Sequence, residues 1–344
     1  MSEKRTVGVA VVGAGAWGKN HVRNFASIPE SNLLYVCDMH EPHRRRAAEM
    51  APDAEATGDL AKVLADERVE AVVVATPPRV HGEVARKAVE AGKDVLVEKP
   101  ITLDLAEARA LVEAANERKR VLMVGHLLKY HSGVRKMRAL VDAGELGRVH
   151  YLYSHRVNLG QVRSDENALW SLAPHDLSIA LYLLPGARPV AAACQGGSYL
   201  QEGIEDVCFG EIFFDGGEVA AVHVSWLDPH KIRRFTVVGS KKMATFDDME
   251  PAEKLRVYDK GAEIPDADAP GPYSGAVTLR NGDVRVPSVK LAEPLRAECE
   301  HFLDCVRERA LPETPGEEGV AVLEILTAMG RSLETGGGRV EIGG

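Results

Sequence analysis

Several features are scarce or absent in this sequence, and each absence removes a class of protein. Acidic residues outnumber basic ones by 51 to 42, so the net charge is −9 and the chain lacks the basic surplus of nucleic-acid binders. No apolar run approaches the roughly 20 residues of a membrane-spanning helix. The five cysteines form no CxxC motif, and the twelve histidines show no metal-ligand spacing. We therefore expect no nucleic acid, membrane or metal among the partners.

The cysteines also bear on the compartment. Their odd number fits buried thiols in a reducing cytoplasm better than disulfides. The N-terminus superficially imitates a signal peptide, because Lys4-Arg5 precedes apolar residues and Ala14-Gly15-Ala16. Cleavage there would destroy the glycine-rich motif of this region, and the apolar run is short and strand-like. We therefore reject a signal peptide and expect a cytoplasmic protein.

The most informative stretch is Thr6–Asp38, where a strand, a glycine-rich turn, a helix and a second strand follow one another. Val7–Val12 is a valine-rich run typical of a buried parallel strand. In the turn that follows, one glycine permits the tight bend, one lets the backbone approach a pyrophosphate, and one lets the helix pack on the strand. The helix N-terminus attracts the anion. We expect a dinucleotide here, contacted by Gly13, Gly15, Ala16, Trp17 and Gly18.

The second strand, Leu33–Cys37, ends in Asp38, where a carboxylate can accept hydrogen bonds from an adenosine ribose. The same charge would repel a 2′-phosphate, so NAD is favoured over NADP. The three arginines at 44–46 are the alternative, as a phosphate site for NADP. Pro42 suggests instead that they lie on the first turns of a helix, on its solvated face. The alternative to dinucleotide binding is an ordinary glycine-rich turn with a solvated Asp38.

Strands and helices alternate through residues 1–125. Beyond the Asp38 strand, we expect helices at about 42–51, 60–65, 82–91 and 105–117, and strands at 71–75, 95–97 and 121–124. This order predicts a doubly wound parallel sheet of the Rossmann type. Ligands bind at the carboxyl ends of such strands. One crevice would therefore collect the glycine-rich turn, Asp38, Thr76-Pro77-Pro78 and Glu98-Lys99-Pro100.

The pattern changes after residue 125, which predicts a second, α+β domain over residues 126–344. Strands are expected at 150–158, 191–196, 207–214, 218–226, 234–238 and 243–246. Glycine-containing turns between neighbouring runs indicate hairpins, and hence a mostly antiparallel, open-faced sheet. Helices such as Pro174–Leu184 can cover one face of it. The other face can meet a second copy of the chain, so we expect a homo-oligomer, a dimer or tetramer.

Two further predictions concern the end of this domain. The segment Asp259–Ser274, rich in Asp, Gly and Pro, is expected as a surface loop. Two late helices, at about 293–308 and 317–333, complete the fold and can pack back on the first domain.

With these motifs the chain resembles the Gfo/Idh/MocA family of sugar and polyol oxidoreductases. The matching elements are the Gly13–Gly18 turn, Thr76-Pro77-Pro78 with His81, and the tract Ala88–Pro100, AVEAGKDVLVEKP, a specific signature of that family. The change of pattern along the whole chain matches as well. Within the family, residues 15–20 and 167–176 look like the bacterial group that oxidises C3 of UDP-N-acetylglucosamine or its uronic acid. In that group an aminotransferase then installs a 3-amino group.

The resemblance implies an NAD-dependent dehydrogenase in which Lys99, of the EKP motif, and His175, of the second domain, are the catalytic residues. A lysine acts as a base only with a strongly depressed pKa, whereas a histidine titrates near neutral pH. Pro174 reads as a helix start, which would put His175 in the first turn, where the dipole disfavours imidazolium. We therefore favour His175 as the proton acceptor and Lys99 as the orienting ammonium, with the reverse assignment open.

The resemblance and the local sequence indicate further contacts. Thr76, Pro77 and His81 are expected near the cofactor, and the motif position of Glu98 implies a hydrogen bond to the nicotinamide ribose. Arginine suits phosphate or carboxylate, and asparagine suits hydroxyl and N-acetyl groups. Substrate contacts are therefore expected from Arg156, Asn158, Arg163, Asn167 and Trp170. Many family members carry aspartate where this chain has Ser171 and Ser178, a departure consistent with the amino-sugar group.

Two other functions stay open at this level. One is oxidation or reduction of a free polyol or sugar such as inositol. The other is a non-catalytic NAD-binding regulator, because folds are reused without turnover. The joint presence of Lys99 and His175 counts against the regulator.

Overall fold

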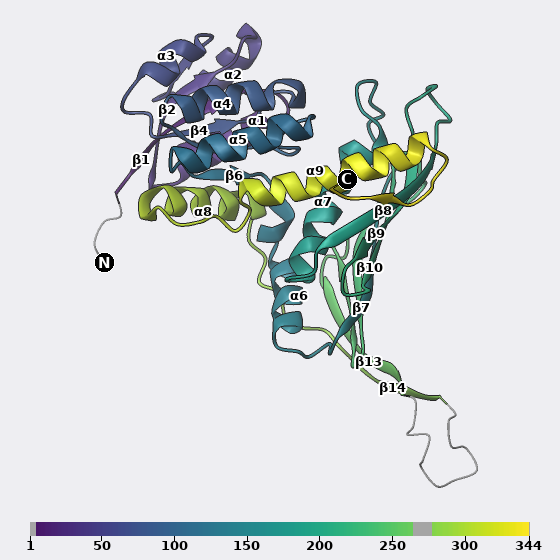
Figure 1. Cartoon of the computed structure of the whole chain (residues 1–344). Coiled ribbons are helices and arrows are strands. Elements are labelled where there is room, and N and C mark those ends of the chain that lie inside the picture. The colour runs from purple at the N-terminus through teal and green to yellow at the C-terminus, as the bar shows by residue number, and fades with distance from the viewer. Residues whose placement is uncertain (1–4, 264–276, 344) are drawn as a thin grey trace, which may run out of the picture. The chain divides into compact units, whose positions relative to one another are not determined.

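The computed structural model describes residues 5–263 and 277–343 and divides the chain into two compact units (Figure 1). The first unit comprises the chain through Tyr130 together with Ala292–Glu324. The second comprises His131–Leu291 together with the chain from Ile325 onward. Helix α9 (Gly316–Glu334) contributes residues to both units. In the described parts of the chain, no helix combines the length and the apolar character that crossing a membrane requires.

The first unit contains a six-stranded sheet in the order β3-β2-β1-β4-β5-β6. In that order its strands span Glu55–Thr57, Ser31–Cys37, Val7–Val12, Ala71–Val74, Asp94–Val97 and Leu122–Val124. All neighbouring strands run parallel. The central strands β1, β4 and β5 are valine-rich and fully buried, as strands covered on both faces must be. The predicted doubly wound parallel sheet is confirmed.

The helices of this unit form two groups. α1 (Gly18–Ser27), α2 (Glu41–Met50) and α8 (Pro294–Glu308) share one apolar core that includes Phe25 and Phe302. α4 (His81–Glu90) packs on α5 (Leu105–Glu117) and on β4 and β5. The shorter helices are α3 (Leu60–Ala65), η1 (Pro78–Val80) and η2 (Leu127–Tyr130).

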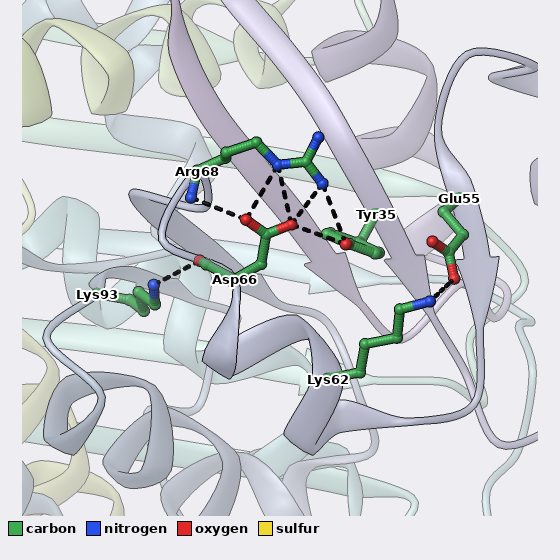
Figure 2. Close-up of polar contacts among 6 residues, drawn as sticks. All are labelled: Tyr35, Glu55, Lys62, Asp66, Arg68 and Lys93. Carbon is green, nitrogen blue, oxygen red and sulfur yellow. Dashed lines mark hydrogen bonds and ion pairs between the residues drawn. The ribbon is translucent and has the colours of Figure 1, made fainter.

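A polar network ties β2 to the loop between α3 and β4 (Figure 2). The Asp66 carboxylate accepts hydrogen bonds from the Tyr35 hydroxyl at 2.8 Å and from Arg68 Nη2 at 2.6 Å. The Asp66 carbonyl accepts a further one from Lys93 Nζ at 2.8 Å, so the start of β5 is attached as well. The hydrogen bonds from Arg68 and Tyr35 hold the pKa of Asp66 below its usual range. The same contact with Asp66 raises the pKa of Tyr35.

The second unit contains a nine-stranded sheet in the order β14-β13-β12-β11-β7-β10-β9-β8-β15. In that order its strands span Thr278–Arg285, Leu255–Glu263, Met243–Asp247, Ile232–Gly239, Val149–Val157, Val219–Ser225, Val207–Phe214, Pro189–Gly197 and Val340–Glu341. β7 and β10 run parallel, and the other neighbouring pairs are antiparallel. The mostly antiparallel sheet predicted for this part of the chain is confirmed.

The two faces of this sheet differ. α7 (Ala168–Leu183) packs on β7, β9 and β10, and α6 (Ser132–Asp142) packs on β12. On the opposite face, which we call the open face, His155 of β7 stands beside His223 of β10, which stands beside Phe209 of β9. Tyr151 and Tyr153 continue the same row along β7. Phe209 keeps 55% of its surface exposed and Tyr151 keeps 46%, so the open face is an aromatic surface.

One predicted helix start was wrong. α7 begins at Ala168, where the Asn167 side chain caps it by accepting a hydrogen bond from Trp170 N at 3.1 Å, and Pro174 lies inside the helix. A proline in a helix interior costs about 3 kcal/mol. The cap and the burial of Leu169 and Ala173 outweigh that cost. His175 consequently lies beyond the first turn, and the dipole argument for its neutral state does not apply.

One predicted loop was wrong in part. Residues 259–263 belong to strand β13, which pairs with β14, while residues 264–274 lie outside the described residues. Strands β3, β14 and β15 were not predicted from the sequence. β3 and β15 span only a few residues, and β14 is polar and almost entirely exposed. Such strands carry no apolar alternation, so only the pairing partner defines them.

Candidate active site

The glycine-rich turn between β1 and α1 has the close packing that a dinucleotide site requires. Gly13 has a φ of +94°, and a Cβ there would lie 2.5 Å from Ala75 O. A Cβ at Gly18 would lie 2.0 Å from Gly13 O, so only glycine lets α1 begin this close to β1. No side chain in the described part of the chain caps α1. No described side chain therefore blocks this helix N-terminus, where Lys19 N and Asn20 N donate to the Gly15 and Trp17 carbonyls.

Asp38 follows β2 and faces the same turn. Its carboxylate accepts hydrogen bonds from Ala14 N at 2.7 Å and His40 N at 2.8 Å, and it contacts His43 Nδ1 at 3.0 Å. Burial by itself raises the pKa of this carboxyl, but the hydrogen bonds from Ala14 and His40 outweigh it and hold the pKa below its usual range. Asp38 is therefore anionic at neutral pH, the state that an acceptor of ribose hydroxyls needs.

The arginines of α2 differ from their predicted solvated placement. Arg46 Nη2 donates to Ala14 O at 2.7 Å, and Arg44 Nη1 donates to Asp38 O at 2.7 Å. Only Arg45 is exposed, where it pairs with Glu41. The helix register explains the difference, because positions 44 and 46 of this short helix lean over the loops after β1 and β2. Arg46 thus braces the glycine-rich turn, and Arg44 braces the loop that carries Asp38.

The carboxyl end of β4 carries Thr76, Pro77 and His81. His81 is buried, with Nδ1 2.7 Å from Pro100 O and Nε2 2.8 Å from Thr76 O. It therefore connects the end of β4 to the peptide after Lys99. Thr76 Oγ1 is buried and has no hydrogen-bond partner among residues 5–263 and 277–343. An unsatisfied hydroxyl beside the glycine-rich turn is a group that a bound cofactor can satisfy.

Glu98 and Lys99 follow β5 directly. The Glu98 side chain is buried, and its Oε1 accepts hydrogen bonds from the Trp17 indole and from His21 Nε2, the latter at 2.7 Å. Its Oε2 accepts one from Lys99 N at 3.2 Å. Burial raises the pKa of Glu98, but the hydrogen bonds from His21 and Trp17 help to outweigh burial, so the pKa lies below its usual range. Glu98 is therefore a carboxylate next to Lys99.

In the second unit, His175 lies on α7 and is half-buried. Its neighbour Asp176 is buried and pairs with Arg156 of β7, at 2.7 Å to Nε and 3.1 Å to Nη2. The Ser178 hydroxyl donates to His175 O at 2.9 Å. The bidentate ion pair fastens α7 to the sheet at the position of His175. Arg156, expected to bind substrate, thus holds the helix.

The other residues expected to bind substrate lie in the segment before α7 or at its start. Asn167 caps the helix and donates to Glu205 Oε2 at 2.6 Å. Arg163 is exposed and pairs with Glu166 at 3.0 Å. Asn158 and Trp170 are half-buried. Arg163 is thus the exposed cation of this segment, while Asn167 has a structural role in the chain itself.

Sequence reasoning missed two residues around Glu98. His21 lies four residues after Trp17, on the same face of α1, and that spacing could have identified it. Cys299 comes from α8 and contacts His21 Nδ1 through Sγ at 3.8 Å, 278 residues away in the chain. No local pattern marks Cys299. Among the described residues, no group of three or more His, Cys, Asp and Glu side chains is arranged to hold a metal ion.

Two family models match segments that together span most of the chain. Residues 7–126 match the model of an oxidoreductase family with an NAD-binding Rossmann fold, and residues 138–342 match the C-terminal α/β domain of the same family. The chain belongs to the Gfo/Idh/MocA family of oxidoreductases. This confirms the predicted family, the NAD-binding Rossmann fold and the prediction that the protein is an oxidoreductase.

Similar members of the Gfo/Idh/MocA family are dehydrogenases of sugar or polyol hydroxyl groups. UDP-N-acetylglucosamine 3-dehydrogenase of Acidithiobacillus ferrooxidans is 32% identical, covering 86% of this chain and 87% of the relative. The NAD⁺-dependent scyllo-inositol 2-dehydrogenase of Bacillus subtilis is 27% identical, covering 95% and 94%. Among solved structures, GenD2 from gentamicin A biosynthesis in complex with NAD has a TM-score of 0.83 at 26% identity, covering 99% and 97%.

Two observations in this Gfo/Idh/MocA chain fit a dinucleotide without reference to any relative. Gly13 and Gly18 let the turn pack directly against Ala75 and the start of α1, which is the close packing of a dinucleotide-binding turn. Thr76 Oγ1 is a buried hydroxyl that lacks a partner within the described residues. The residues that can hold the cofactor are Gly13, Gly15, Ala16, Trp17, Gly18, Asp38, Thr76, Pro77 and Glu98.

Proposed function

We propose that the protein is an NAD-dependent dehydrogenase that oxidises the C3 hydroxyl of a UDP-linked N-acetylamino sugar, or of its uronic acid, to the ketone. The observation that carries the proposal is the 32% identity to UDP-N-acetylglucosamine 3-dehydrogenase over 86% of the chain. The ketone would then undergo transamination, in the biosynthesis of cell-surface polysaccharide or lipid A sugars. The cytoplasm, which supplies NAD and UDP-sugars, is the proposed location.

The choice of NAD over NADP rests on Asp38. The anionic carboxylate lies where a 2′-phosphate would approach, and two like charges repel. Arg44 and Arg46, which could have neutralised a 2′-phosphate, already donate to backbone carbonyls. Glu98 is the proposed partner of the nicotinamide ribose, and His81 holds Thr76 and Pro100 beneath the cofactor.

The proposed chemistry divides the work between two side chains. Bound NAD supplies the hydride acceptor. His175 takes the proton of the substrate hydroxyl, and Lys99 holds the reacting oxygen as an ammonium, since Glu98 beside it is a carboxylate. The Arg156–Asp176 pair keeps the His175 segment in place. Asn158, Arg163, Asn167 and Trp170 are the proposed substrate contacts.

The role of His175 predicts an asymmetric loss in His175→Asn. Turnover should fall by about 10²–10⁴-fold, the usual contribution of a positioned general base, while the dissociation constant for NAD stays within about twofold. Steady-state kinetics and a fluorescence titration with NADH measure the two quantities. Equal losses in turnover and in cofactor affinity would contradict the proposed role.

The substrate is tested by NADH formation with UDP-N-acetylglucosamine, its uronic acid, myo-inositol and glucose. Alcohol oxidation by NAD is unfavourable at neutral pH, so the assay includes an aminotransferase and amino donor that remove the 3-keto product. The expected result is turnover with one of the UDP-sugars and none in His175→Asn. Turnover only with inositol or glucose would overturn the amino-sugar assignment.

The inositol outcome is the second candidate function. It is favoured by the 27% identity to scyllo-inositol 2-dehydrogenase, which extends over 95% of this chain. NAD binding without turnover on any of the four compounds would support instead a non-catalytic NAD-binding regulator.

We also propose that the open face of the second sheet joins two copies of the chain. It carries Tyr151, Tyr153 and Phe209 on a surface that the helices leave uncovered. Exposed aromatic patches of this kind mark interaction surfaces. A twofold axis through the face would bring the same residues of both copies together.

A further inference from the structure

The buried Glu98 carboxylate is held by side chains for which the proposed reaction gives no role toward Lys99. Trp17 and His21, at the start of α1, donate to Glu98, and Cys299 of α8 contacts the other ring nitrogen of His21 at 3.8 Å. Trp17, His21 and Phe25 follow one another at four-residue spacing, so they share one face of α1. His21 and Phe25 are stacked, with ring centroids 6.3 Å apart.

The hydrogen-bonding capacity of each group determines which atom donates and which accepts in this network. An ionised carboxylate only accepts, and an indole only donates. His21 therefore carries its proton on Nε2, which donates to Glu98, and its Nδ1 is left to accept from the Cys299 thiol. Glu98 Oε1 accordingly receives two N–H groups.

The second oxygen of Glu98 is held by the backbone of the next residue, Lys99. Oε2 accepts from Lys99 N at 3.2 Å. A Cβ at Gly125, the residue after β6, would lie 2.9 Å from the same oxygen, so the backbone after β6 closes the other side. The hydrogen bonds from Trp17, His21 and the Lys99 amide together orient the carboxylate, and the charge of Lys99 is one of the causes that lower the pKa of Glu98.

The charges around Glu98 leave it as the single anion of the group. The titratable groups that face it are His21 from α1, Glu298 and Cys299 from α8, and Lys99. Burial, and then the charge of Glu98, raise the pKa of Glu298 well above its usual range, so Glu298 is a neutral acid. Burial likewise raises the pKa of Cys299, which stays a thiol.

We infer that Trp17 and His21 are positioning residues: by holding the Glu98 carboxylate beside Lys99, they keep Lys99 an ammonium through the reaction. This inference rests on the proposed role of Lys99 in the reaction. It adds Trp17 and His21 as residues that act on Lys99 through Glu98. Without the two donors the carboxylate is free to turn or to take up a proton. Lys99 then loses its nearby negative charge and releases its proton at lower pH.

The test compares His21→Phe, which removes the N–H donor but keeps a ring, with His21→Gln, whose amide can donate to Glu98. Trp17→Phe removes the other donor at a side chain that is 43% exposed, so it is expected to fold even if His21→Phe does not. His150→Phe, at an exposed histidine of the second unit, is the matched control.

The first readout needs no substrate. Trace acetylation of each variant over a range of pH, with the Lys99 peptide quantified by mass spectrometry, gives the apparent pKa of Lys99. We expect His21→Phe and Trp17→Phe to lower it by about half a unit or more, and His21→Gln and His150→Phe to leave it near the wild-type value. The second readout is the pH profile of kcat/KM, whose basic limb should move to lower pH in the same two variants.

The outcomes separate the inference from the proposed function. Unchanged Lys99 acetylation in folded Trp17→Phe and His21→Phe would overturn the inference, whatever the substrate. A shift in Lys99 acetylation without turnover on any tested sugar would support the inference and count against the proposed function.

Discussion

At the scale of single residues, Asp38 determines how the adenosine end of the cofactor is recognised. Its carboxylate is held by two backbone amides, and it is anionic because these hydrogen bonds outweigh burial. A hydrogen bond to a charged group contributes about 1.5–3 kcal/mol, and about 1.4 kcal/mol corresponds to tenfold in affinity.

We therefore predict that Asp38→Ala weakens NAD binding by about tenfold or more and reduces the preference for NAD over NADP. Titrations of tryptophan fluorescence with NADH and NADPH measure both effects. Glu41→Ala, at the exposed carboxylate that pairs with Arg45, is the control and should leave both affinities unchanged. An unaltered ratio of the two affinities in Asp38→Ala would show that another group selects the cofactor.

In the described part of the chain, Glu298 is a buried carboxyl group without hydrogen bonds to offset its loss of solvation. It is 0% exposed, and neither carboxyl oxygen has a hydrogen-bond partner there. Burial raises its pKa well above the usual range, so folding at neutral pH takes up a proton. This group's contribution to stability is therefore greatest below the unfolded pKa of about 4.3 and declines as the pH rises toward the folded value.

Burying the Glu298 carboxyl without hydrogen bonds is unfavourable for folding. An apolar side chain of similar length removes this unfavourable contribution. We predict that Glu298→Met raises the free energy of unfolding at neutral pH by about 1–3 kcal/mol. The free energy of unfolding of the variant should also fall less than that of the wild type between about pH 5 and about pH 8. Urea unfolding at these two pH values measures both effects, with the exposed Glu300→Met on the same helix as control. A less stable Glu298→Met would mean that the carboxyl has a buried water as partner.

At the scale of elements, the Asp66 network joins β2, the loop before β4 and the start of β5 (Figure 2). The depressed pKa of Asp66 means that its contribution is complete above the unfolded pKa and is lost as the pH falls through the folded value. The network connects three segments, whereas the neighbouring Lys62–Glu55 pair is an ordinary surface contact.

We predict that Asp66→Ala lowers the urea midpoint of unfolding at neutral pH and that the deficit shrinks in acid. Glu55→Ala, which breaks the surface pair in the same figure, should change the midpoint little. Equal midpoints for the two variants would show that the Asp66 network adds no stability. Catalytic constants serve as the check that the turn of Gly13–Gly18 is undisturbed.

Elements also show where sequence reasoning succeeds and fails. The strands Val7–Val12 and Val207–Phe214 and the helix Leu105–Glu117 were predicted with their observed bounds, because apolar periodicity and end signals agree there. The start of α7 was missed because Pro174 is a strong local stop signal, and the cap at Asn167 lies upstream of it. β13 was missed because its end runs into a stretch rich in Asp, Gly and Pro, a composition typical of loops.

At the scale of the whole molecule, the open face of the second sheet is the surface that a partner copy would cover. Phe209 and Tyr151 are exposed there, and His155 and His223 approach each other at 3.3 Å between their Nδ1 atoms. Burial lowers the pKa of both histidines, so they are neutral at physiological pH and favour an apolar contact.

We predict that the wild-type chain is a dimer or a tetramer and that Phe209→Lys dissociates it, because a charge would be buried without a partner. Light scattering coupled to size exclusion measures the mass. Leu311→Lys, at a leucine of the first unit that is 80% exposed, is the matched control and should keep the assembly. A monomeric wild type, or an intact Phe209→Lys oligomer, would remove the open face as the interface.

The sequence by itself determined the alternation of buried strands and helices, the glycine-rich turn with Asp38, and the family motifs, because each is a local pattern written in adjacent residues. Only the tertiary structure decided the partners of the functional side chains. Cys299 meets His21 from the far end of the chain, Asp176 pairs with Arg156, and Arg46 turns back onto the first loop. These contacts depend on which elements pack together, and hydrogen bonds between distant residues leave no periodicity for a sequence to show.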